Sequence, residues 1–250
     1  MEENKDEKKK ILAIDSSGLV ASVAVICGDE LIAEYTVNYK KTHSQTLLPM
    51  LEEVKKMTDL DLESIDAIAV AAGPGSFTGL RIGSATAKGL GLALGKPLLA
   101  VPTVDGLAFN LYGTEKCICP IMDARRNQVY TGVYRFEGQE GQFVLKTVKE
   151  QCAVSIDELL DFLNTAGEEV IFLGDGVPVF RERIAAGCKV SYSFAPAHMN
   201  RQRAASIAAL GMIYLKQGKV QTAAEHAPEY LRMSQAERER LEKSCPGQVI

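Results

Sequence analysis

The chain has 250 residues, 46% of them hydrophobic and 24% charged, and a formal net charge of −4. This composition is typical of a water-soluble globular protein and lacks the overall basic excess of many nucleic-acid-binding proteins. With three histidines and no tryptophan, the chain has little material for a metal centre or a base-stacking platform.

The first ten residues, MEENKDEKKK, are almost all polar. They do not have the pattern of a secretory signal, and no apolar segment of the chain is long enough to cross a membrane. Residues 1–10 are therefore predicted to be a disordered tail. The protein is predicted to be cytoplasmic and free of membrane attachment.

The first half of the chain alternates short β-rich runs with helical periodicity. Tight turns between the first three runs predict an antiparallel meander. In the helix that follows, Leu47, Leu51 and Val54 recur at three- and four-residue spacing. The expected order is three strands, a helix, a strand, a helix and a strand: 11–15, 21–27, 31–38, 44–57, 65–72, 76–95 and 97–101.

The second helix of this half begins near Ser76, a good N-cap residue. Glycine or alanine occupies every fourth position along it: Gly79, Gly83, Ala87, Gly91 and Gly95. Residues four apart form one ridge, and a ridge without side chains lets another segment approach closely. Because each helical glycine costs about 1 kcal/mol relative to alanine, close packing must offset the loss. The sequence leaves open whether that packing lies within the domain or between molecules.

The second half repeats the pattern. A strand that ends in Asp123 resembles the one that ends in Asp15, and each is followed by a polar turn and a β-rich run. The expected elements are a helix, three strands, a helix, a strand, two helices and a charged terminal helix: 104–112, 117–123, 128–136, 143–149, 156–163, 170–173, 178–185, 201–217, and from 234 onward. The order predicts a duplicated, two-lobed α/β fold with βββαβα in each lobe.

The predicted domain limits are 11–103 for the first lobe, 104–220 for the second and 221–250 for a C-terminal extension. The packing of the late amphipathic helix 201–217 stays open between the second lobe and a return to the first. The six cysteines have no CxxC pair and no zinc-like spacing, so they are predicted to be reduced and mostly buried.

Several turns are candidates for phosphate binding. Gly73, Gly75 and Gly79 have a spacing one residue too long for the dinucleotide fingerprint, and no P-loop is present. The turns after the two matching strands could present backbone N–H groups to a polyphosphate, or could be ordinary turns rich in aspartate and serine. The residues of this candidate nucleotide cleft are Asp15, Ser16, Ser17, Asp123, Gly174, Asp175 and Gly176.

Other polar residues allow two interpretations each. His43 starts the first helix, where a lone histidine is usually a capping or surface residue. Arg125 and Arg126, beside Tyr130, could contact phosphate or RNA, or could form a solvated turn. No histidine pair has metal-ligand spacing, and no serine or cysteine nucleophile motif occurs.

Four segments carry a family resemblance: 11–27, 43–49, 73–83 (GPGSFTGLRIG) and 228–232 (PEYLR). They resemble the bacterial TsaB family, also called YeaZ. The resemblance implies the ribonuclease H-like fold of actin, hexokinase and heat-shock ATPases. It further implies a role in making threonylcarbamoyladenosine in tRNA. In that role the protein would be a scaffold that binds the transferase TsaD and helps to recruit the ATPase TsaE. It would form a homodimer when alone and would contact tRNA only through the complex.

The resemblance also implies where the partner binds. The first helix and the glycine-rich helix are expected to form the TsaD contact, through His43, Leu47, Leu51, Val54, Gly79, Arg81, Gly83 and Ala87. The substitution Gly83→Leu is accordingly expected to abolish TsaD binding and to leave the monomer folded.

TsaD-like proteins carry metal-binding histidines after the strand that follows the glycine-rich helix. Thr103 and Leu107 stand at those positions here, and neither side chain can replace an imidazole on a metal. No catalytic residue, metal or cofactor is therefore expected in this chain, with ATP or ADP in the complex left open. The alternatives are an active ATP-dependent kinase or carbamoyl transferase, in which Asp15 and Asp123 would hold magnesium, and, less favoured, a peptidase.

Overall fold

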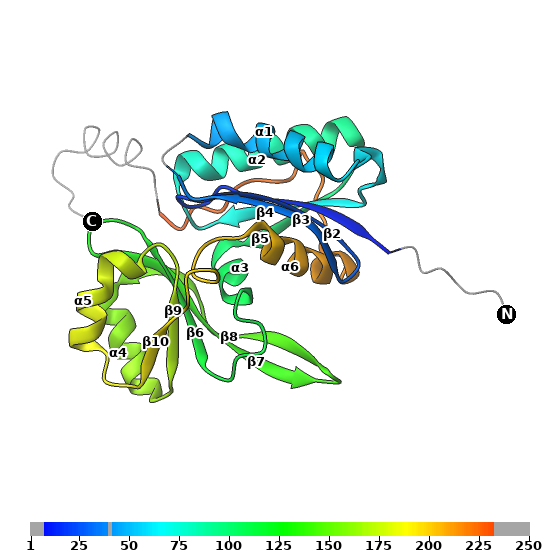
Figure 1. Cartoon of the computed structure of the whole chain (residues 1–250). Coiled ribbons are helices and arrows are strands. Elements are labelled where there is room, and N and C mark those ends of the chain that lie inside the picture. The colour runs from blue at the N-terminus through cyan, green and yellow to red at the C-terminus, as the bar shows by residue number, and fades with distance from the viewer. Residues whose placement is uncertain (1–7, 40–41, 233–250) are drawn as a thin grey trace.

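The computed structural model describes residues 8–39 and 42–232. It contains two lobes, each built on a five-stranded sheet (Figure 1). The first eight elements are β1 (Lys10–Asp15), β2 (Ala21–Cys27), β3 (Glu30–Val37), α1 (His43–Met57), η1 (Leu62–Ser64), β4 (Ala67–Gly73), α2 (Phe77–Leu94) and β5 (Leu98–Pro102). The next nine are α3 (Thr103–Phe109), β6 (Cys117–Asp123), β7 (Gln128–Gln139), β8 (Gln142–Ser155), α4 (Ile156–Ala166), β9 (Val170–Leu173), α5 (Val177–Gly187), β10 (Tyr192–Phe194) and α6 (Ala204–Lys216).

The two sheets have the same topology. The strand orders are β3-β2-β1-β4-β5 and β8-β7-β6-β9-β10. The first strand of each half pairs antiparallel with the next strand and parallel with the fourth. The duplicated α/β fold predicted from the sequence is confirmed. Strand β10 was not predicted, because three residues are too few to show a periodicity.

The late helix α6 returns to the first lobe. Its buried residues Ile207 and Ala208 pack with Ala13 and Ala69 on the inner face of the first sheet, and Figure 1 shows α6 beneath that sheet. A Cβ placed on Gly211 would lie 2.9 Å from the Cβ of Ala69. Small side chains on both surfaces therefore allow the helix to lie close to the sheet.

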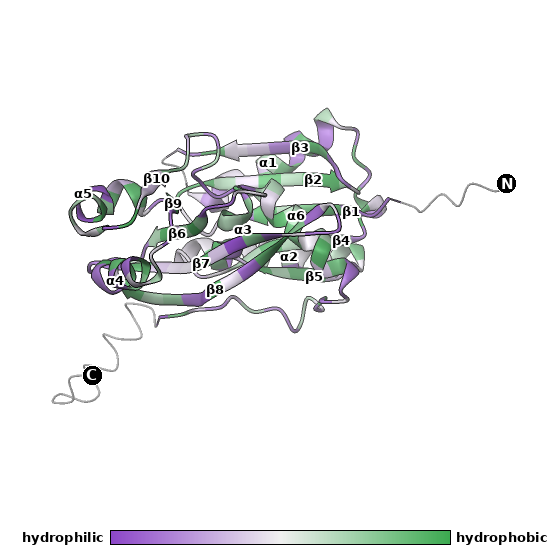
Figure 2. Ribbon diagram, turned by 90° about the horizontal axis from the view of Figure 1, so that it is seen from below, coloured by the Kyte–Doolittle hydropathy of each residue, from purple (hydrophilic) through white to green (hydrophobic). Residues whose placement is uncertain are grey.

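Helix α3 packs on the sheet of the second lobe, as α6 packs on the sheet of the first. Although it directly follows β5 in the chain, Val104 and Leu107 pack with Ile118 and Tyr134 of the second sheet. Each lobe thus has one inner-face helix adjacent to the interlobe region. Figure 2 shows that the hairpin β7–β8 beside α3 also carries hydrophilic residues along its length.

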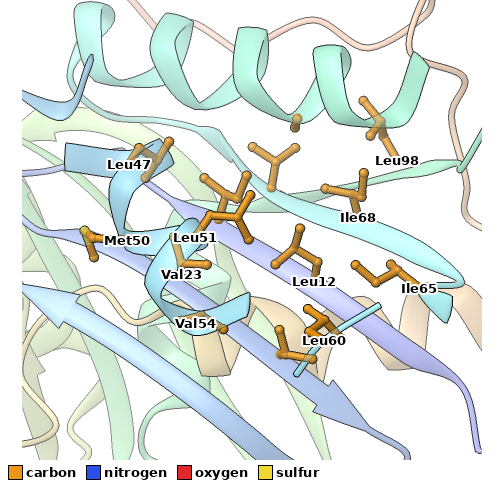
Figure 3. Packing of buried hydrophobic residues seen from close by; sticks show 14 of the residues in the cluster. Leu12, Val23, Leu47, Met50, Leu51, Val54, Leu60, Ile65, Ile68 and Leu98 are labelled. Atoms are coloured by element: carbon orange, nitrogen blue, oxygen red, sulfur yellow. The ribbon is translucent and has the colours of Figure 1, made fainter. Parts of the chain in front are cut away.

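Helices α1 and α2 cover the outer face of the first sheet. Figure 3 shows Leu47, Leu51 and Val54 pointing toward Leu12 and Ile68 of that sheet. The three α1 residues are exposed by only 2%, 6% and 4%. The prediction that they form an apolar row available to a partner is therefore wrong, because they fill the core of their own lobe.

The glycine ridge of α2 also faces inward. A Cβ on Gly79 would lie 2.1 Å from the backbone oxygen of Ser16, and one on Gly83 would lie 2.5 Å from Ser16 Oγ. Ser16 Oγ donates a hydrogen bond to the Gly79 carbonyl at 2.8 Å, and Ala87 is fully buried. Packing within the domain is thus the correct interpretation. The prediction of a solvent-facing ridge at Gly83 is wrong, because Gly83 is buried. The substitution Gly83→Leu is accordingly expected to destabilise the monomer.

Two other predictions have different outcomes. Ser76 is the N-cap of α2, and its side chain accepts a hydrogen bond from the Gly79 amide, as expected. Five cysteines in the described ranges are free: Cys27, Cys117, Cys119, Cys152 and Cys188. The helix expected from Ser234 and most of the predicted tail, residues 1–7, lie outside the residues that the structure describes.

Candidate functional site

A pocket of about 600 Å³ lies between the lobes. The turn after β1 supplies Ser17 and Gly18, whereas Asp123 comes from the end of β6 and Arg125 from the turn that follows it. These are the two turns that the internal repeat places at equivalent positions, because β1 and β6 occupy the same place in their sheets. The duplicated topology therefore brings two segments more than a hundred residues apart to the walls of one pocket.

The predicted cleft residues divide into three groups. Ser17, Asp123 and Asp175 line the pocket. Asp15 and Ser16 are buried beneath it, exposed by 1% and 2%. The two glycines of the third turn pack on Ile121 instead, since a Cβ on Gly174 or Gly176 would lie 2.2 Å or 2.9 Å from its carbonyl oxygen.

Two buried carboxyl groups lie at the base of the pocket. Ser17 donates to Asp15 Oδ1 from its backbone nitrogen at 2.9 Å and from its hydroxyl at 2.6 Å. Burial raises the pKa of Asp15 to about 6, although the Ser17 hydrogen bonds oppose the shift. Burial likewise raises the pKa of Asp175 to about 6, against the opposing charge of Arg201. Asp175 Oδ1 is buried and has no hydrogen-bond partner in the described structure.

His43 and Gln202 hold the turn after β1 from two sides. His43 Nε2 lies 2.8 Å from the carbonyl oxygen of Gly18. The amide of Gln202 packs against the α-carbon of Gly18, where a Cβ would lie 2.4 Å from Gln202 Nε2. A larger residue at Gly18 would require the Gln202 side chain to move. The role of His43 is therefore more specific than the capping role that the sequence suggested, and Gln202 gave no sequence signal because it is distant in the chain.

The turn after β6 has an unusual backbone. Arg125, Arg126 and Asn127 have φ values of +64°, +55° and +57°, a region that non-glycine residues rarely enter. Asp123 Oδ1 accepts a hydrogen bond from the Arg125 amide at 2.8 Å, and Asp123 Oδ2 lies 3.2 Å from Arg125 Nη1. These contacts hold the turn, and both arginine side chains are exposed at its tip.

Residues 221–232, which we call the C-terminal strap, run along the first lobe. Gln221 exchanges two backbone hydrogen bonds with Leu98 at 2.8 Å and 2.9 Å, and so covers the edge of β5. His226 is buried, and its carbonyl oxygen accepts a hydrogen bond from Lys88 Nζ. Burial lowers the pKa of His226, and the charge of Lys88 adds to this effect.

The end of the strap connects the lobes. The Glu229 amide donates to the Ala72 carbonyl at 2.7 Å, and Gln151 Nε2 of the second lobe donates to Glu229 Oε2 at 2.8 Å. Arg232 Nη1 donates to the Ala124 carbonyl at 2.6 Å, within the turn after β6. The strap therefore forms one wall of the pocket. Its PEYLR sequence carries only the family resemblance, because the position of the strap depends on tertiary contacts.

A second candidate surface is the exposed side of α1 and α2, called here the outer face and defined by Leu48, Arg81, Ala85, Gly89 and Leu92. Leu48 and Leu92 are exposed by 55% and 71%. A Cβ on Gly89 would meet no atom within 4 Å. Arg81 stacks on Phe77 at 3.9 Å. Of the residues predicted to contact a partner, Arg81 is exposed and His43 is half-buried, whereas the other six are buried.

The positions predicted to lack metal ligands lie in the core. Thr103 and Leu107 are exposed by 0% and 1%. No group of three or more histidine, cysteine, aspartate or glutamate residues in the described ranges could hold a metal ion. No helix there is long and apolar enough to cross a membrane.

Comparisons with known proteins agree with one another. The family described as "TsaD: tRNA N6-adenosine threonylcarbamoyltransferase" matches residues 30–240. The Bacillus subtilis protein named "tRNA threonylcarbamoyladenosine biosynthesis protein TsaB" is 33% identical over 232 residues, or 93% of this chain and 98% of that protein. The Escherichia coli protein of the same name is 34% identical over 146 residues, or 55% and 62% of the two chains. A Pseudomonas aeruginosa structure described as YeaZ superposes with a TM-score of 0.72 and 26% identity, covering 89% of this chain and all of that one.

Proposed function

This chain belongs to the TsaB (YeaZ) family, and on that premise we propose that it is a non-catalytic subunit in the biosynthesis of threonylcarbamoyladenosine in tRNA. In this role it binds and supports the transferase TsaD and helps to recruit the ATPase TsaE. Its match to the TsaD family over most of its length supports descent from a common two-lobed ancestor.

The observation that carries the non-catalytic role is the burial of Thr103 and Leu107. The resemblance places metal-binding histidines of TsaD at these two positions. Here the Leu107 side chain belongs to a hydrophobic core with Val104 and Tyr134, and Thr103 is fully buried. A metal site at these positions would need polar ligands and access to substrate. The test is threonylcarbamoyl transfer by the purified chain alone, for which we expect none.

We place the TsaD contact on the outer face. A glycine in the middle of an exposed helix costs about 1 kcal/mol relative to alanine, and at Gly89 no contact within the chain offsets this cost. Close approach of a partner backbone would offset it. Leu48 and Leu92 would add apolar area, since burying one such side chain contributes roughly 1.5–3 kcal/mol. The same face is our candidate for the homodimer contact in the absence of TsaD.

The substitution Gly89→Arg is expected to weaken TsaD binding at least a hundredfold. Arginine has a higher helix propensity than glycine, so the monomer should be slightly more stable, but its side chain would occupy the space left for the partner. Titration calorimetry of purified chain with TsaD measures the affinity. The matched control is Ala185→Arg on the exposed side of α5, which should bind TsaD like the unmodified protein. Equal affinities of the two variants would exclude the outer face.

Recruitment of TsaE has its own measurement. The mass of the assembly formed by this chain, TsaD and TsaE, with and without ATP, should increase on adding TsaE only when this chain is present. An assembly of TsaD and TsaE that forms equally well without it would contradict the recruiting role.

The alternative of an active ATP-dependent enzyme has one observation in its favour. Of the two aspartates expected to hold magnesium in that case, Asp123 lines the interlobe pocket and Asp15 is buried beneath it, while Asp175 also lines the pocket. Carboxylates there could hold magnesium. Titration of the isolated chain with ATP and magnesium separates the hypotheses. Micromolar binding accompanied by turnover would favour the enzyme and would contradict the proposed non-catalytic role.

A further inference from the structure

Cationic side chains gather at the mouth of the interlobe pocket. Arg125, Arg126 and Arg232 all line it, and the Arg125 side chain is 85% exposed. The overall charge of the chain is −4, so this concentration of arginine is local. The backbone of the turn that carries Arg125 and Arg126 is in the left-handed region, and Asp123 Oδ1 accepts a hydrogen bond from the Arg125 amide.

Aromatic side chains stand beside these arginines. Tyr39 is 70% exposed and Tyr230 is 39% exposed, and both line the pocket together with Tyr130. Tyr230 is fixed by its ring contact with Phe77, at a centroid distance of 4.7 Å. Exposed aromatic rings interleaved with arginines are the arrangement on which single-stranded nucleic acids stack their bases and place their phosphates. We call Tyr39, Arg125, Arg126, Tyr130, Tyr230 and Arg232 the cleft rim.

The interior of the pocket has a different character. Asp175 Oδ1 and His43 Nδ1 are buried there without hydrogen-bond partners in the described structure. A buried polar atom without a partner is costly, and the amino and hydroxyl groups of a nucleoside could satisfy a carboxylate oxygen. A volume of about 600 Å³ is within the range of pockets that hold small ligands, so one nucleotide fits.

We propose that the cleft rim binds single-stranded RNA of the tRNA substrate, with phosphates on Arg125 and Arg126, bases stacked on the tyrosines, and one nucleotide inserted into the pocket. This inference rests on the proposed function, and it departs from the expectation that tRNA is met only through the complex. RNA is favoured over a free nucleoside triphosphate because the carboxylates of Asp123 and Asp175 lie in the pocket. A triphosphate drawn inside would face these acids, whereas an RNA strand keeps its phosphates at the arginine-bearing mouth.

The charged groups around the rim are consistent with this arrangement. Asp123 is already paired with Arg125, and Glu229 accepts a hydrogen bond from Gln151. Arg232 uses Nη1 to bond Ala124. Asp123 and Glu229 thus have partners within the chain, and the Arg125 side chain remains 85% exposed and accessible to phosphate.

The test is fluorescence anisotropy of a labelled tRNA transcript titrated with the full chain. The double variant Arg125→Asn/Arg126→Asn removes both charges, and asparagine tolerates the left-handed backbone. We expect its affinity to fall about tenfold. We also expect the slope of log affinity against log salt to become shallower by roughly 1.4, because each phosphate contact on a single strand contributes about 0.7. Tyr39→Ala should weaken binding severalfold, and Tyr39→Phe should restore it.

The matched control removes two exposed lysines outside the pocket, Lys189→Asn/Lys216→Asn, and should leave both affinity and slope unchanged. Equal RNA affinity for the unmodified chain and the arginine double variant would overturn the inference, as would complete competition by AMP or ATP at micromolar concentration, which would identify a free-nucleotide site. If the arginine double variant unfolds, Tyr39→Ala and Tyr39→Phe decide instead: RNA affinities equal to that of the unmodified chain in both variants would overturn the inference. TsaD binding is measured separately on the same proteins. If the unmodified chain does not bind TsaD, the proposed function is contradicted. If TsaD binding is intact and the RNA affinity of the variants is unaltered, only this inference is contradicted.

Discussion

Gly83→Leu is expected to lower the free energy of unfolding by roughly 3 kcal/mol or more. A Cβ alone would lie 2.5 Å from Ser16 Oγ, and the rest of a leucine side chain has no space between α2 and the turn after β1. The hydroxyl of Ser16 would have to move and lose its hydrogen bond to the Gly79 carbonyl. The gain in helix propensity, under about 1 kcal/mol, is too small to offset this.

Gly89→Ala, six residues along the same helix, is the matched comparison. A Cβ at Gly89 meets nothing within 4 Å, so this substitution should raise the free energy of unfolding by up to about 1 kcal/mol. Urea denaturation followed by circular dichroism gives both values. If Gly83→Leu proved as stable as the unmodified protein, the packing of α2 against the Ser16 turn would be refuted.

Asp105→Asn is expected to stabilise the protein at neutral pH and to have little effect in mild acid. Tyr134 donates a hydrogen bond to Asp105 Oδ1 at 2.7 Å. Burial raises the pKa of Asp105 to about 6, against the opposing effect of that hydrogen bond, and the charges of Glu150 and Glu229 add to the rise. The same carboxyl would titrate near 3.8 in the unfolded chain.

The direction of the pH dependence follows from these values. The folded protein binds the Asp105 proton more tightly than the unfolded chain does. Protonated Asp105 therefore makes its full contribution to the free energy of unfolding below about pH 4, and this contribution is lost as the pH rises through about 6. A difference of about two pKa units corresponds to roughly 2–3 kcal/mol. The substituted asparagine would keep an acceptor for Tyr134 without ionising. The free energy of unfolding of the Asp105→Asn variant should therefore exceed that of the unmodified protein by roughly 2 kcal/mol near pH 7.5, and this difference should vanish near pH 4.

Asp15 and Asp175, whose pKa values are also raised to about 6 by burial, should leave part of the pH dependence in the Asp105→Asn variant. The control is Asp161→Asn, at a position on the exposed side of α4. Its free energy of unfolding should differ from that of the unmodified protein by the same small amount at both pH values. An Asp105→Asn advantage that did not change with pH would show that Asp105 does not titrate as described.

The sequence alone determined the architecture. Hydrophobic periodicity, turn residues and the echo between the strands ending in Asp15 and Asp123 predicted the repeated βββαβα order, and both sheets have it. These signals are local, because alternation and helical spacing depend on neighbours in the chain. The motif GPGSFTGLRIG likewise identified the TsaB family, because it concentrates turn, cap and close-packing requirements in one segment.

Only the tertiary structure decided which face of each helix is covered. A glycine or alanine at every fourth position of α2 shows that something packs closely against that ridge, but it does not show which segment covers Gly83. Gly83 lies against Ser16, whereas a Cβ on Gly89 would meet nothing within 4 Å, because Gly89 is off the ridge that packs inward. The strap, the exchange of α3 and α6, and the cleft rim depend in the same way on long-range contacts, such as that of Arg232 with Ala124. Sequence periodicity specifies that a face is buried, whereas the identity of the covering segment depends on how distant elements meet in space.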